Sequence, residues 1–258
     1  MKYKRIKSGA IIVTATLSLC LAGCGGSKVL KEPTPLVVTQ ALTTASDQHL
    51  SMTLDWVIVR DGPGTWARNA DWDEYLIHVQ NESDDSLHVT NITVVDSLGT
   101  RIDAGDSRRQ LVKGAKKAKR RYKGEGLTVK AGAGAGTMMA AGAVTAAAAM
   151  SVGAAAAFSS SAVAGAAVGG LVLAPVLAVG GVFRGVNNSK VSNQIEVRQT
   201  LLPVVLQEGE EKVLDIFFPL TPSPRLVELT YVDSRGEHIL IVDTSASLEG
   251  LHLVRDAN

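Results

Sequence analysis

Few residues in this 258-residue chain have the types and spacing that chemistry requires. The five histidines are scattered and show no paired spacing typical of metal ligands. Asp71, Asp73 and Glu74 lack the glycine and the following ligands of a calcium loop. The run Gly132 to Gly136 mimics a phosphate-binding loop, but no Gly-Lys-Ser/Thr ending follows it. We therefore expect no enzymatic activity, no metal site and no cofactor.

Trp66 is the residue most suited to binding a ligand by stacking. It stands between Gly64 and Arg68 in a turn-rich stretch, and an exposed indole there would offer its face to a sugar or a peptide. Trp56 and Trp72 are expected in the core, which is also the more ordinary place for Trp66.

The strongest chemical signal is a cysteine near the N-terminus. A basic stretch and a short apolar run from Ile11 to Leu21 precede it, as in a secretory signal peptide over residues 1–23. The last residues of this segment resemble the lipobox of bacterial lipoproteins, in which a small residue precedes the cysteine that becomes acylated. The matching residues are Leu21, Ala22, Gly23 and Cys24.

The lipoprotein resemblance implies a diacylglycerol thioether and an amide-linked acyl chain, such as palmitate, on Cys24. Gly25 and Gly26 follow, with no Asp after the cysteine, which by analogy favours the outer membrane. Cys20 is the other cysteine and is removed with the signal, so we expect no disulfide in the processed chain.

A second signal is the run Ala131–Phe183, which has 53 residues and no charged side chain. It divides at Ser159-Ser160-Ser161 into arms of about 42 and 33 Å if helical, and a bilayer core is about 30 Å thick. Pairs of glycines four residues apart suit close helix packing in lipid. They are Gly132 and Gly136 in the first arm, and Gly165 and Gly169 in the second.

The run therefore predicts a membrane-type helical hairpin over 131–183, with transmembrane helices. The spacing resembles the glycine-zipper hairpins of bacterial envelope lipoproteins, including the surface-exclusion lipoproteins of conjugative plasmids. Three alternatives remain open: a low-complexity loop without fixed structure, a hairpin buried in a soluble oligomer, and insertion into the inner membrane.

A basic segment over 104–130 precedes the uncharged run. Three alternatives are open for its cations. They would form a solvated face, contact anionic headgroups or lipid A phosphates, or pair with a neighbouring subunit, since the chain outside this segment is acidic. Nucleic acid is excluded by the exported compartment and by the scarcity of interleaved aromatic residues. The residues expected to make the anionic contact are Arg108, Arg109, Lys116, Lys117, Lys119, Arg120 and Arg121, in a segment that also contains Lys113 and Lys123.

The remainder reads as short β-strands over 51–103 and 196–254, separated by turn residues. Runs such as Val79-Gln80-Asn81-Glu82-Ser83 and Glu208-Gly209-Glu210-Glu211 resemble immunoglobulin-like modules of bacterial exported proteins. The predicted fold is mainly β: a single immunoglobulin-like β-sandwich, split by an inserted Ala/Gly-rich α-helical hairpin. Residues 24–50 are expected to be a tether that contains at most one strand, Leu36 to Thr39. Two small β-modules flanking a membrane hairpin are the alternative.

Together these features predict a lipid-anchored outer-membrane lipoprotein whose body faces the periplasm or the exterior. We expect a structural or assembly role in the envelope, with membrane lipids as partners. The hairpin would drive self-association, as a ring or pore-like homo-oligomer. The alternative is a monomeric, lipid-anchored binding module that presents its loops to a polysaccharide or an envelope protein.

Overall fold

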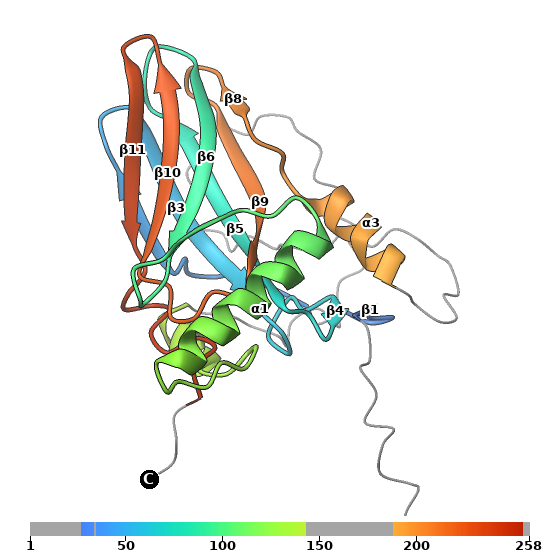
Figure 1. Ribbon diagram of the computed structural model, residues 1–258. Helices are drawn as coiled ribbons and strands as arrows, with labels where there is room; N and C mark the ends of the chain where they lie inside the picture. Colours follow the sequence, from blue (N-terminus) through green and yellow to red (C-terminus); the bar gives the residue numbers. More distant parts are fainter. Residues whose placement is uncertain (1–26, 34, 143–187, 255–258) are drawn as a thin grey trace, which may run out of the picture.

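The computed structural model describes residues 27–33, 35–142 and 188–254 of the chain. Most regular structure in these ranges is antiparallel β-strand, arranged in two large sheets and one small pair (Figure 1). The prediction of a mainly β chain is therefore confirmed. We call the two large sheets together the β-body.

The first sheet contains β6 (Leu87–Val95), β7 (Arg101–Asp103), β8 (Val204–Leu206), β10 (Leu226–Asp233) and β11 (Gly236–Asp243). Its order is β11-β10-β6-β7, and β8 also pairs with β6. In β11, Leu240 and Val242 are buried while Ile239 and Ile241 are exposed, which is the alternation expected of a sheet with one covered face.

The second sheet contains β2 (Thr43–Ser46), β3 (Leu50–Ile58), β5 (Trp72–Asn81) and β9 (Glu211–Pro219), in that order. β9 lies beyond residues 143–187 in the chain, yet it pairs with β5 from Trp72↔Pro219 to Gln80↔Glu211. β6 pairs in the same way with β10. Strands from before and after residues 143–187 are therefore neighbours in both sheets.

One hydrophobic core joins the two sheets, which lie face to face in Figure 1. It includes Ile92 and Leu229 from the first sheet and Leu54, Ile77 and Phe218 from the second, all essentially inaccessible to solvent. Each such side chain contributes about 1.5–3 kcal/mol when it leaves water, so this core is the main source of stability.

The predicted tether over 24–50 is wrong from Ser27 onward. Ser27 is buried, and β1 (Lys28–Val29) pairs with β4 (Ala67–Arg68). Leu36, Val38 and Leu42 lie in the core of the β-body, and β2 then forms the edge of the second sheet. The prediction failed because Pro33 and Pro35 suggested an irregular segment. The apolar side chains after them are nevertheless spaced so that they reach the core.

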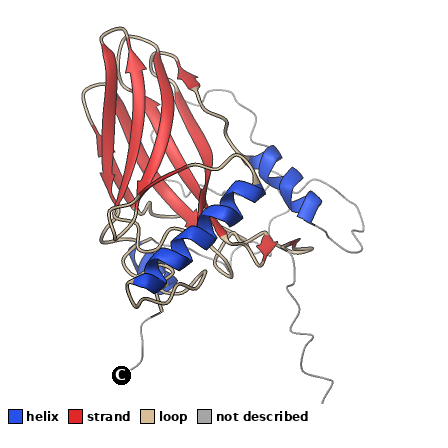
Figure 2. Ribbon diagram, in the orientation of Figure 1, coloured by secondary structure: helices blue, strands red, loops and turns tan. Residues whose placement is uncertain are grey.

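In the described part of the chain, three helices accompany the β-body: α1 (Arg108–Gly124), α2 (Ala135–Ala141) and α3 (Asn188–Arg198). Figure 2 shows α1 crossing the lower end of the strands. Ser107 caps α1, because its Oγ accepts a hydrogen bond from the Gln110 N–H at 3.4 Å. Leu111 of α1 and Val191 and Ile195 of α3 share a second hydrophobic cluster with Phe217 of β9.

The structure contradicts the prediction of a transmembrane helix. Within the described ranges, no helix combines the length and the apolar content that crossing a bilayer requires. The expected first arm begins as a turn over 131–134, and its helix, α2, has seven residues. Ala135 and Met138 of α2 pack into the core of the β-body. Residues 143–187, which contain Gly165, Gly169 and the second arm, lie outside the described residues.

Gly132 and Gly136 do not form a helix-packing pair. Gly132 precedes α2 at φ +77°, and a Cβ there would lie 2.3 Å from the Arg60 carbonyl oxygen. Gly136 lies within α2, and a Cβ there would meet nothing within 4 Å. The first glycine therefore allows the backbone to approach the β-body, and the second does not make a close contact.

The two glycines should respond oppositely to the same substitution. Gly132→Ala is expected to lower the free energy of unfolding by about 2 kcal/mol or more, because the methyl group meets a backbone oxygen at positive φ. Gly136→Ala should raise it by about 0.5 kcal/mol through helix propensity. Chemical denaturation of both variants provides the test, and equal losses would contradict the different roles.

Candidate functional site

Helix α1 presents a row of cations to solvent. The exposed cations fall within a sector of about 120° around the helix axis, given 100° per residue. Among the described residues, none of them forms an ion pair with a carboxylate. We call this set the basic face, and it consists of Arg109, Lys113, Lys116, Lys117, Arg120 and Lys123.

The opposite side of α1 is buried, and it fixes the orientation of the basic face. Leu111, Ala115, Ala118 and Tyr122 have almost no exposed surface. The Tyr122 hydroxyl lies 2.8 Å from Ser97 Oγ and donates to the Pro222 carbonyl at 3.1 Å. Because apolar contacts and hydrogen bonds both hold this side, the six cations point away from the β-body.

The cations on the flanks of α1 have internal partners. Lys119 Nζ lies 2.9 Å from Asp71 Oδ1, and Arg121 forms an ion pair with the buried Asp96. Arg108 Nη2 donates to Ser27 Oγ at 3.3 Å. Of the seven cations expected to contact an anionic surface, these three are therefore engaged within the protein. The other four, Arg109, Lys116, Lys117 and Arg120, belong to the basic face.

The start of the described chain lies beside this helix. Ser27 receives the Arg108 hydrogen bond, and Lys28 then pairs in register with Arg68, with both side chains exposed. Like charges directly opposite each other in a sheet repel, so this pair suits an environment that supplies anions. Sequence spacing gave no signal for it, since strand pairing brings residues 28 and 68 together.

Trp66 cannot serve as a stacking platform, because it is 2% exposed. Its Nε1 donates to Glu74 Oε2 at 2.6 Å, and the Arg198 guanidinium lies 5.3 Å from its ring centroid. Arg198 also donates to Glu74 Oε1 at 2.9 and 2.6 Å. The prediction of an exposed indole is wrong because Glu74 supplies the buried acceptor that the indole N–H needs. Sequence reasoning did not identify Arg198.

Asp215 lies next to this buried cluster. Burial and, secondarily, the Glu74 carboxylate raise the pKa of Asp215 to about 7, against the opposing charge of Arg198. The folded protein therefore binds a proton at Asp215 more tightly than the unfolded chain, in which an Asp has a pKa of about 3.9. Stability from this group is complete below about pH 4 and is lost as the pH rises through about 7.

Asp215→Asn should flatten the dependence of stability on pH. Between about pH 4 and 7 the wild-type free energy of unfolding should lose up to about 1.4 kcal/mol per pH unit from this group, and the variant should not. Urea denaturation across this range tests the expectation. Asp84→Asn, at an exposed carboxylate, is the matched control, and identical slopes for all three proteins would contradict the assignment.

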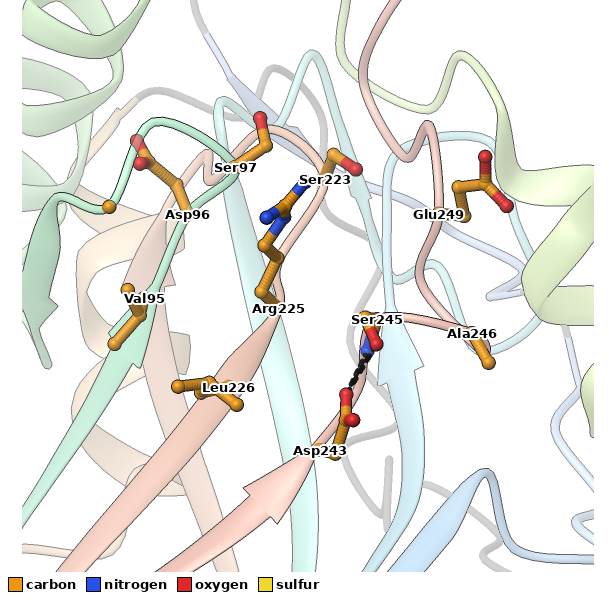
Figure 3. Close-up of a pocket in the computed structure, with 11 residues that line it drawn as sticks. Val95, Asp96, Ser97, Ser223, Arg225, Leu226, Asp243, Ser245, Ala246 and Glu249 are labelled. Carbon is orange, nitrogen blue, oxygen red and sulfur yellow. Dashed lines mark hydrogen bonds between the residues drawn. The ribbon is translucent and has the colours of Figure 1, made fainter.

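A pocket of about 740 Å³ opens at the end of the first sheet (Figure 3). Two of its carboxylates have internal partners, since Asp96 pairs with Arg121 and Asp243 accepts a hydrogen bond from Ser245. Arg225 and Glu249 remain as charged lining residues, and neither was identified from the sequence. The lining is mixed, because apolar side chains such as Val95 and Leu226 lie beside these two charges. The pocket is lined by Val95, Asp96, Ser97, Gly99, Ser223, Arg225, Leu226, Asp243, Ser245, Ala246 and Glu249.

The buried pair of His252 and Asp73 has a structural role. His252 is inaccessible, and its Nδ1 accepts from the Gly132 N–H at 3.0 Å, so its Nε2 donates to Asp73 Oδ2 at 2.9 Å. These bonds join the C-terminal segment, the turn before α2 and strand β5. Within the described ranges, no group of His, Cys, Asp and Glu side chains is arranged to hold a metal ion.

The packing of α1 against the β-body should depend strongly on Tyr122. Tyr122→Ala is expected to lower the free energy of unfolding by about 3 kcal/mol, because it leaves a cavity and removes two hydrogen-bond partners. Lys123→Ala, the next residue but on the basic face, should change it by less than about 0.5 kcal/mol. Chemical denaturation compares the two, and similar effects would contradict the orientation of the helix.

Comparisons with protein families, with curated proteins and with solved structures find no match for this chain. The lipobox residues Leu21, Ala22, Gly23 and Cys24 lie outside the described residues.

Proposed function

We propose that this chain is an exported lipoprotein whose β-body is held at the outer membrane by acylation of Cys24. The observation that carries the proposal is the position of Ser27. This residue is buried in the fold, three positions after the lipobox cysteine. Three residues span at most about 11 Å, so an acyl anchor on Cys24 would hold the β-body close to the bilayer.

The energy of such an anchor is sufficient for stable attachment. Each buried CH₂ of an acyl chain contributes about 0.8 kcal/mol, and the lipoprotein resemblance implies several chains on one residue. A membrane-spanning helix is not required for attachment. This distinction matters because the described part of the chain contains none.

We further propose that the β-body is an immunoglobulin-like sandwich. Two antiparallel sheets share one core, and each contains strands from before and after residues 143–187. This arrangement supports a single β-domain with an insertion, which is a common way to add a segment to a stable scaffold.

For the biological role, we infer a structural or assembly component of the cell envelope. The support is the concentration of exposed charge on one rigid helix beside the start of the folded chain. Such a surface suits contact with a membrane or a partner. Association with further copies of the chain or with another envelope protein remains a prediction.

Replacing the acylated residue tests the proposal directly. Cells that express the wild-type chain and are fed labelled palmitate should incorporate label into it, and Cys24→Ala should abolish that label. The variant should also fail to undergo lipobox-dependent processing. Gly25→Ala, at the next position, serves as the control and should keep the label. Unchanged labelling of Cys24→Ala would contradict the lipid anchor.

A binding module is the second candidate, and the pocket beside Arg225 favours it. Native mass measurement in mild detergent separates the two roles. A discrete multimer of the wild-type chain favours assembly. A monomer that retains an envelope protein, and loses it on Arg225→Ala or Glu249→Ala, favours the binding module.

A further inference from the structure

We propose that the basic face of α1 docks on the anionic headgroups of the bilayer and thereby sets the orientation of the β-body. This inference rests on the proposed acylation of Cys24 and deepens it, because an anchor alone leaves the body free to rotate. The occupant of the basic face is a lipid surface that displays phosphate groups.

The proposed anchor lies close to one end of the helix. Ser27 lies within hydrogen-bond distance of Arg108, the first residue of α1. With at most about 11 Å of chain between Cys24 and Ser27, the membrane must lie near this end of the helix. The helix is about 25 Å long, so the reach of the connection is less than half of its length.

Positively charged side chains extend around α1 from Ser27 to the basic face. Arg108 and Lys119 face the start of the folded chain, through Ser27 and Asp71 respectively. Around the helix axis, Lys116 and Lys123 follow within about 60° of Lys119. Lys28 and Arg68 add exposed positive charge at the same end. The anchor and the nearer edge of the basic face, Lys116 and Lys123, therefore lie on the same side of the helix.

The side chains of the basic face have the chemistry that suits a lipid surface. Four of the six cations are lysines, whose flexible ammonium groups act as point charges and do not need the fixed geometry of a protein partner. Each cation near an anionic lipid surface adds to binding, and salt screens the attraction. The field of a row on a rigid helix is strongest where the cations are closest together, from Lys113 to Arg120.

The experiment places one fluorescent reporter on the acylated, processed chain in vesicles. Cys20 and Cys24 are the two cysteines of the sequence, so removal of the signal and acylation leave no thiol until one is introduced. Gly124→Cys places the reporter at the end of α1 without removing a charge, where a Cβ meets nothing within 4 Å. Ser234→Cys places it in the exposed β10–β11 turn, at the opposite end of the β-body.

The readout is quenching by a spin label on the lipid headgroup. In vesicles that contain phosphatidylglycerol, the Gly124→Cys reporter should be quenched more strongly than the Ser234→Cys reporter, and about 1 M salt should remove the difference. Neutralising two cations with Lys116→Gln and Arg120→Gln should lower the ratio of docked to undocked protein about thirtyfold. Lys212→Gln with Arg235→Gln removes the same charge far from α1 and should not.

Anchor and orientation are measured separately. Flotation with neutral phosphatidylcholine vesicles reports acylation, so a chain that does not float there contradicts the proposed function. A chain that floats but shows equal quenching at both sites contradicts the docking inference alone. Equal effects of the two double variants would also overturn it. A multimer that dissociates on Lys116→Gln and Arg120→Gln would assign the basic face to a second copy instead.

Discussion

The burial of one side of α1 against the β-body is the contact on which the arrangement of charge depends. Tyr122 and Leu111 are fully buried, and a Cβ at Gly114 would lie 2.5 Å from Pro219 Cγ, so the helix lies very close to the end of β9. A helix bound this closely cannot rotate without losing core contacts. The cations therefore have a fixed direction, which distinguishes this helix from a flexible basic tail.

Part of this architecture could be predicted from the sequence, and the reasons for the failures are physical. The runs Leu87 to Val95 and Leu226 to Val232 predicted strands correctly, because branched and aromatic side chains suit a pleated, half-buried surface. The prediction of a bilayer-length helix was wrong within the described residues, because small residues also allow close contact between backbones. Gly132 is an example, since its backbone approaches the Arg60 carbonyl oxygen. The sequence left an exposed Trp66 open, because the buried acceptor Glu74 and its partner Arg198, 124 residues from Glu74, leave no local signal.

The candidate site could also be predicted only in part from the sequence. The basic segment was evident from composition, but composition does not divide its cations. Within α1, the structure assigns Arg108, Lys119 and Arg121 to internal contacts and leaves six other cations exposed. A tether as far as residue 50 was expected, but the chain is folded from Ser27 onward, and Ser27 is only three positions after Cys24. The distance between Cys24 and the folded part of the chain is therefore limited by covalent geometry.

The central claim is that the β-body lies against the membrane surface with α1 at the interface. Neutron reflectometry of the acylated protein on a supported bilayer containing phosphatidylglycerol measures the gap between headgroups and protein. We predict protein density that begins at the headgroups, with no intervening water layer, and that moves outward when Lys116 and Arg120 are neutralised. A hydrated gap that is the same for both proteins would contradict the account.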